Sequence, residues 1–114
     1  MDTPPELRDR LLQLSRIWRN DEDDCYLELH ANGTAQDYFF DGSGSTGHWR
    51  IIGPDEIGIL LPVEGFKPEE DKMYISVFTG GELKIENRKH DYSADYRRVD
   101  TNPFRDTTRR STAN

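Results

Sequence analysis

The chain has 114 residues, enough for one domain and too few for two independent hydrophobic cores. Hydrophobic residues make up 33% and charged residues 32%, and an aromatic content of 11% argues against a disordered chain. The net charge of −7 has the wrong sign for a protein that binds nucleic-acid phosphates. We therefore expect a small ordered core in a polar shell, and no nucleic-acid partner.

No apolar run is long enough to cross a membrane, and the N-terminus lacks the basic and apolar regions of a signal peptide. The single cysteine, Cys25, cannot form an internal disulfide, which fits a reducing compartment. The sequence therefore predicts a cytoplasmic protein with no membrane anchor.

The first 18 residues predict one short amphipathic helix. Thr3 is suited to the N-cap, prolines follow it, and Glu6 completes a capping-box pattern. The apolar residues recur at spacings of four, three and four, so they share one face: Leu7, Leu11, Leu14 and Trp18. Residues 17–19 either end this helix or begin a strand.

From residue 17 onward, short alternating runs separated by turn residues predict about eight strands. The runs comprise a hairpin over 25–40, then 48–52, 56–61, 73–78, 83–87 and 92–99. Their connections are too short for parallel crossovers, so the pattern favours a small up-and-down antiparallel β-barrel over a two-sheet sandwich. We expect a single domain over 1–100 and, because 101–114 lack any apolar period, a disordered C-terminal tail.

The hairpin over 25–40 admits three registers. A two-residue turn places Glu28 opposite Asp37, and a three-residue bulged turn carries Asp37 inward beside Leu27. A four-residue turn over 30–33 buries no charge, so we favour it. That register turns inward Cys25, Leu27, Leu29, Tyr38 and Phe40, and outward Tyr26, Glu28, Ala35 and Asp37.

Alternation also assigns the inward residues of the later strands. These are Trp49, Ile51, Ile57, Ile59, Leu61, Met73, Ile75, Val77, Leu83 and Ile85. The large aromatic side chains either fill the barrel interior or form the walls of a pocket. On the second interpretation, the ligand-binding residues are Tyr38, Phe40, Trp49, Tyr74 and Phe78.

Five short segments resemble the small bacterial lipocalin-like members of the calycin superfamily. They are "IWR" near the start, "YLELHANGT", "GHWRI", "GGELKI" and the closing "YRRV". The resemblance covers roughly residues 17–99 and implies an eight-stranded up-and-down barrel with a helix near one end. It also implies binding of a small apolar ligand, or inhibition of a protease or lysozyme, and it transfers no catalytic residue.

Histidines, acidic residues and a glycine-rich loop are present, but none has the spacing of a known metal-binding or phosphate-binding motif. His30, His48 and His90 do not have the spacing of a helical metal motif. The acidic run over 20–24 lacks the glycine and distal glutamate of a calcium loop, and "DGSGSTG" over 41–47 lacks the lysine of a phosphate loop. We therefore expect no enzyme, no metal and no cofactor.

Two functional hypotheses follow. The first is a non-enzymatic, lipocalin-like binding protein that holds a small apolar or amphipathic ligand among its inward aromatic residues. The alternative is an acidic protein-protein interaction module, an inhibitor or immunity-type protein, that acts on a basic partner. Its interaction surface would consist of Asp21, Glu22, Asp23, Asp24, Glu69, Glu70 and Asp71.

Overall fold

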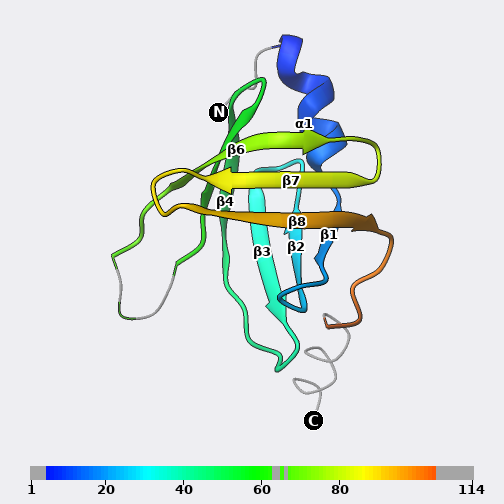
Figure 1. Ribbon diagram of the computed structural model, residues 1–114, viewed down its shortest axis with the longest axis vertical. Helices are drawn as coiled ribbons and strands as arrows, with labels where there is room; N and C mark the ends of the chain where they lie inside the picture. The colour runs from blue at the N-terminus through cyan, green and yellow to red at the C-terminus, as the bar shows by residue number, and fades with distance from the viewer. Residues whose placement is uncertain (1–4, 63–64, 66, 105–114) are drawn as a thin grey trace.

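Eight antiparallel strands close into a barrel in the computed structural model, which describes residues 5–62, 65 and 67–104 (Figure 1). Each strand pairs with its neighbours in the sequence, and β8 pairs back onto β1. The strands are β1 (Ile17–Asn20), β2 (Cys25–Leu29), β3 (Thr34–Phe39), β4 (Thr46–Gly53), β5 (Glu56–Leu60), β6 (Asp71–Phe78), β7 (Glu82–Asn87) and β8 (Tyr92–Val99). The predicted up-and-down barrel is confirmed, and the sandwich is excluded.

A short helical segment covers one end of the barrel (Figure 1). A 3₁₀ turn, η1 (Pro5–Leu7), leads into α1 (Arg8–Leu14), whereas the predicted cap at Thr3 lies outside the described residues. The chain turns at Ser15 and enters β1 at Ile17, so residues 17–19 begin a strand. The Trp18 indole N–H donates to the Leu14 carbonyl at 3.0 Å, which ties the last turn of α1 to the first strand.

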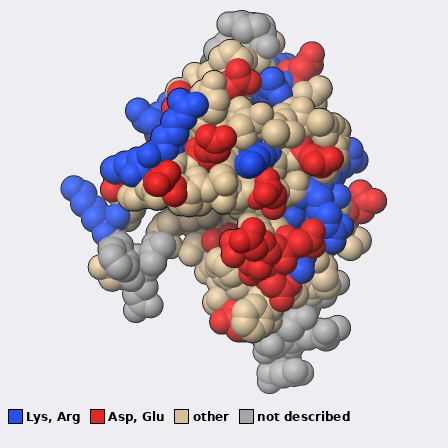
Figure 2. Space-filling model, in the orientation of Figure 1, with Lys and Arg blue, Asp and Glu red and all other residues tan. Residues whose placement is uncertain are grey.

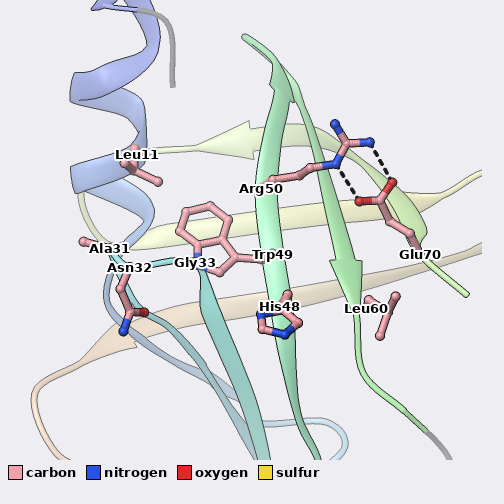
Figure 3. A pocket seen from close by; sticks show the side chains of 9 residues that line it. All are labelled: Leu11, Ala31, Asn32, Gly33, His48, Trp49, Arg50, Leu60 and Glu70. Carbon is pink, nitrogen blue, oxygen red and sulfur yellow. Dashed lines mark hydrogen bonds and ion pairs between the residues drawn. The ribbon is translucent and has the colours of Figure 1, made fainter. Parts of the chain in front are cut away.

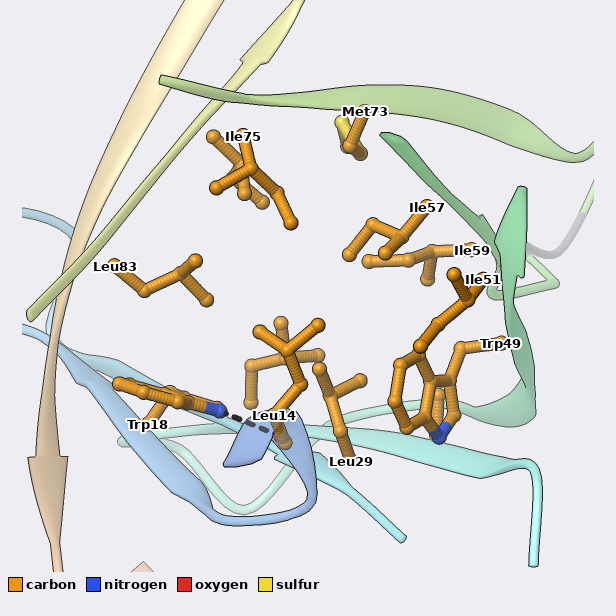
Figure 4. Packing of buried hydrophobic residues seen from close by; sticks show 13 residues of the cluster. Leu14, Trp18, Leu29, Trp49, Ile51, Ile57, Ile59, Met73, Ile75 and Leu83 are labelled. Carbon is orange, nitrogen blue, oxygen red and sulfur yellow. Dashed lines mark hydrogen bonds between the residues drawn. The ribbon is translucent and has the colours of Figure 1, made fainter. Parts of the chain in front are cut away.

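The hydrophobic core fills the barrel beneath α1 (Figure 4). Its buried members are Leu14, Trp18, Leu27, Leu29, Ala35, Trp49, Ile51, Ile57, Ile59, Met73, Ile75, Leu83 and Ile85. The inward assignments for β4, β5 and β7 are therefore confirmed. In β6, Val77 is 41% exposed because the register shifts between Ile75 and Val77, and Phe78 packs against the core instead.

The β2–β3 hairpin has a different register from the one we predicted. Leu27 lies opposite Asp37, because the chain turns through three residues and ends the turn at Gly33 with a φ of +93°. Glycine adopts this left-handed conformation without a steric penalty, and it produces the bulge. The inward residues of β3 are consequently Ala35, Asp37 and Phe39. Tyr38 and Phe40 face outward, and Phe40 is 69% exposed.

Residues 101–104 lie against the outer face of β2. The Asn102 side-chain amide donates to Glu28 at 2.7 Å, and the Phe104 ring meets the Tyr26 ring edge-on at a centroid distance of 5.0 Å. Tyr26 and Glu28 point outward as predicted, yet both are buried beneath this segment. The prediction of a disordered tail is therefore wrong for 101–104, and 105–114 lie outside the described residues.

Candidate ligand-binding site

A cavity of about 230 Å³ lies in the barrel at the end opposite α1. Four connections surround this open end: β1–β2, β3–β4, β5–β6 and β7–β8. Residues of the hydrophobic core form the apolar floor of the cavity: Leu27, Ile59, Met73 and Ile85. Polar side chains line the rest of its wall: Asn20, Asp23, Cys25, Asp37, Asp71, Tyr92 and Tyr96. The site is therefore amphipathic.

Asp37 is the carboxylate that the bulged hairpin turns into the barrel. Its Oδ1 accepts the backbone N–H of Ser45 at 2.5 Å, and its own backbone N–H donates to the Ser45 carbonyl at 3.0 Å. Burial raises the pKa of the Asp37 carboxyl, and the hydrogen bond from Ser45 opposes that effect. Asp37 lines the cavity, so its carboxylate is a hydrogen-bond acceptor of that wall.

The two tyrosine hydroxyls and the cysteine thiol of the cavity wall keep their protons at physiological pH. Burial raises the pKa of the Tyr96 hydroxyl, which is hydrogen-bonded to Asn20, and burial also raises the pKa of Tyr92. Burial, together with the charge of Asp23, raises the pKa of the Cys25 thiol to about 11. The thiolate is the nucleophilic form of cysteine, so the environment of Cys25 disfavours nucleophilic chemistry.

The described residues offer no arrangement of ligands for a metal ion. Nowhere among them do three or more His, Cys, Asp or Glu side chains group as metal ligands would. Asp71 instead lies 3.7 Å from the His90 imidazole, and Asp23 contacts the Asn20 amide at 3.3 Å. The cavity can therefore contribute hydrophobic contacts, hydroxyl groups and carboxylate acceptors to binding.

The aromatic residues predicted to bind a ligand do not come together. Tyr38 and Tyr74 lie on the outer surface, where the Arg88 guanidinium stacks 3.9 Å above the Tyr74 ring. Trp49 belongs to the core, and Phe78 packs beside Trp18 at the helix end with ring centroids 6.2 Å apart. Exposed Phe40 completes the set, and none of the five lines the cavity.

The aromatic residues that do line the cavity were not selected from the sequence. They are Phe39, Tyr92 and Tyr96, with Tyr26 at the edge. The useful signal was the alternation in the last strand, where Tyr92, Ala94 and Tyr96 occupy every second position between polar residues. Asp37 was assigned outward because the favoured register buried no charge.

A second hollow lies on the outside of the barrel, beside the β2–β3 turn (Figure 3). Its volume is about 320 Å³, and it is bounded by Leu11, Trp49 and Arg50 among others. The Trp49 indole N–H donates to the His30 carbonyl at 2.8 Å, and Arg50 binds Glu70 through two hydrogen bonds of 2.7 and 2.9 Å. These polar groups of the hollow thus bind one another, and the side chains of Asn32 and His48 also line it.

The first group of predicted interaction residues forms the β1–β2 turn, over which acidic side chains gather (Figure 2). Arg97 binds Asp21 through two hydrogen bonds, and Arg19 contacts both Asp21 and Asp24. These cations lower the pKa of Asp21, with Arg97 the larger cause. Much of the negative charge of this turn is therefore balanced within the protein, although Glu22 is exposed.

The second acidic group, Glu69 to Asp71, lies at the same open end of the barrel. Lys89 binds Glu69, and Arg50 binds Glu70. Asp71 faces His90 and also lines the cavity. One residue of each acidic group, Asp23 and Asp71, therefore lines the same cavity, and intramolecular cations lie beside most of the seven carboxylates.

Comparison of the chain with protein-family models, curated proteins and solved structures found no match. The site must therefore be interpreted from its own geometry. No helix within the described ranges is long and apolar enough to cross a membrane.

Proposed function

We propose that this protein is a non-enzymatic binding protein that holds a small amphipathic ligand in the open end of its barrel. The observation that carries the proposal is the cavity of about 230 Å³, which has a core-lined apolar floor and polar walls. Convergent polar groups around an apolar pocket are typical of small-molecule sites. The lipocalin-like resemblance of residues 17–99 favours the same function.

The cavity restricts the size and polarity of the ligand. Pockets for drug-sized molecules start at about 300 Å³, so the ligand is smaller than these. Its apolar part would pack on Leu27, Ile59 and Met73, and its polar end would donate hydrogen bonds to Asp37. A small organic amine meets both requirements, whereas an organic acid would place a second negative charge beside Asp37.

The acidic interaction module has less support as an alternative. Arg19, Arg50 and Arg97 already bind carboxylates of the predicted interaction surface. A basic partner would have to compete with these ion pairs, because exposed carboxylates that are paired within the chain attract a partner less strongly. Glu22 and Asp23 are exposed acids from which such an interaction could start.

Probes that share one apolar body test the proposal. Benzylamine, benzyl alcohol and benzoate are titrated into the full chain, and binding is followed by calorimetry and by the melting temperature. We expect benzylamine to bind most tightly and benzoate least. Failure of both benzylamine and benzyl alcohol to bind would contradict the proposal.

A pair of variants locates the binding. Ala94→Leu adds side-chain volume inside the cavity, whereas Ala31→Leu makes the same change in the exposed β2–β3 turn. We expect the first variant to lose benzylamine binding and the second to retain it. Equal binding by a folded Ala94→Leu variant would place the ligand elsewhere.

A further inference from the structure

A third hollow, of about 280 Å³, lies at the helix end of the molecule, on the opposite side from the proposed ligand cavity. It is bounded by α1, the β6–β7 turn and the last part of β8. Three arginines line it: Arg10, Arg16 and Arg98. Its other lining residues are Gln13, Phe78, Thr79 and Gly80, and none of them is acidic. This is notable in a chain of net charge −7.

The barrel and the helix hold the three guanidinium groups in place by different contacts. Arg10 stacks 4.8 Å above the Phe78 ring, and its distance of 3.8 Å from Asp55 makes only a loose ion pair. Arg16 donates to the carbonyls of Leu12 and Ser15, both at 3.0 Å, at the C-terminal end of α1. Among the side chains that the structure describes, neither arginine makes a further ion pair, so N–H donors of both guanidinium groups remain for a ligand.

Arg98 completes the group from the barrel side. It lies opposite Trp18 in the β1–β8 pairing, and its backbone N–H donates to the Gly81 carbonyl at 2.9 Å. Its guanidinium group forms no ion pair with any side chain that the structure describes. Three cations that share one hollow repel one another, and a bound anion would relieve that repulsion.

We propose that this hollow is a binding site for a small oxyanion, a phosphate or carboxylate group carried by a small organic molecule. Guanidinium groups bind the paired oxygens of such anions through charge-assisted hydrogen bonds, and Gln13 adds an amide donor. The hollow exceeds the volume of the oxyanion alone, and the Phe78 ring provides an apolar surface for the organic part. This site is independent of the ligand proposed for the barrel cavity.

Titration of the full chain at low ionic strength tests this inference. The probes are inorganic phosphate, phenyl phosphate and benzoate, each compared with potassium chloride at the same ionic strength. We expect the phosphates to raise the melting temperature beyond the chloride control, and phenyl phosphate to bind more tightly than inorganic phosphate. A stronger effect of benzoate than of phenyl phosphate would assign the site to carboxylates. No effect of any probe beyond chloride would overturn the proposal.

Matched variants locate the anion. Arg98→Gln removes one cation from the hollow, and Arg8→Gln removes one from an exposed position on the same helix as Arg10. We expect Arg98→Gln to weaken phenyl phosphate binding about tenfold or more, the loss expected for a charge-assisted hydrogen bond, and Arg8→Gln to change it less than about twofold. Equal effects of the two variants would indicate general charge screening and would contradict a site.

A third variant separates this proposal from the proposed function. Ala94→Leu fills the barrel cavity at the other end and should leave phenyl phosphate binding unchanged. Loss of phenyl phosphate binding in this variant, with the melting temperature preserved, would move the anion into the barrel cavity and overturn the inference.

Discussion

Asp37 lies directly opposite Leu27 on neighbouring strands, and both side chains line the cavity in the barrel. A carboxylate beside a core leucine is unfavourable unless hydrogen bonds stabilise it. The backbone N–H of Ser45 provides one such bond, and the loop between β3 and β4 is held against the cavity as a result. The register that the turn at Gly33 sets thus also determines the polarity of the site.

Replacement of Asp37 by Asn should alter how stability depends on pH. Because burial raises the pKa of this carboxyl in the folded state, the folded protein holds the proton more tightly than the unfolded chain does. The contribution of Asp37 to the stability of the wild type therefore falls as the pH rises above about 4, the usual carboxyl range, until Asp37 is ionised in the folded state. The Asp37→Asn variant has no carboxyl group here and lacks this loss. The difference in melting temperature between the variant and the wild type should therefore shift in favour of the variant as the pH rises through that interval.

Asp41→Asn is the control for the Asp37 variant, because it is a nearby aspartate with the opposite shift. Hydrogen bonds from Ser43 lower the pKa of exposed Asp41. Its contribution to stability is therefore present above the unfolded pKa and is lost as the pH falls. Thermal unfolding from acid to neutral pH should give differences of opposite sign for the two variants. Differences of the same sign would contradict the environment described for Asp37.

Gly47 is placed where β4 approaches the backbone of β5. A Cβ atom at this position would lie 1.8 Å from the Leu60 carbonyl oxygen, so Gly47→Ala forces the two strands apart. We expect a loss of about 1–3 kcal/mol of unfolding free energy, typical of overpacking. In the same strand, a Cβ at Gly53 meets nothing within 4 Å, and Gly53→Ala should be neutral or slightly stabilising. Urea denaturation of both variants measures the difference.

Truncation of two phenylalanines near the open end should have very different effects on the free energy of unfolding. Phe104 packs edge-on against Tyr26 and lies 5.8 Å from the Arg19 guanidinium, whereas Phe40 is 69% exposed. Phe104→Ala should cost about 1 kcal/mol or more and increase amide exchange in β2. Phe40→Ala should change stability by less than about 0.5 kcal/mol. Equal effects would show that residues 101–104 do not stabilise the barrel.

The thiol of Cys25 should be unreactive in the folded protein. Its pKa of about 11 leaves little thiolate at pH 8, and the side chain is buried. Labelling with a chromogenic disulfide reagent should therefore be slow in buffer and fast in denaturant. Rapid labelling of the native protein would mean that Cys25 is open to solvent at the mouth of the cavity.

The sequence predicts the strands well because alternation is a local property. Ile57, Ile59, Leu83 and Ile85 alternate with other residues along their strands, and all four are buried. The prediction fails for Val77, because a bulge in β6 shifts the register and turns this side chain outward. No residue near Val77 indicates the bulge in the sequence. The alternation of apolar residues therefore predicts the strands of the barrel, but it does not predict the bulge in β6.

The candidate site was harder to predict because it depends on contacts between distant residues. Avoiding a buried charge is a sound rule, but Asp37 is turned inward by the left-handed Gly33 and stabilised by the backbone of Ser45. Likewise, Asn102 is buried by a bond to Glu28, 74 positions earlier in the chain. Neither partner can be identified from the residues adjacent to it.

Pairing of β8 with β1 has a consequence for how other molecules can attach. Each of the eight described strands has a hydrogen-bonded neighbour on both sides, so no described strand has an edge that is unpaired along its whole length. The sheet therefore offers no complete free edge to which a peptide strand, or the sheet of a second copy, could add. Recognition must therefore proceed through side chains and connecting loops, at the two ends or on the outer wall.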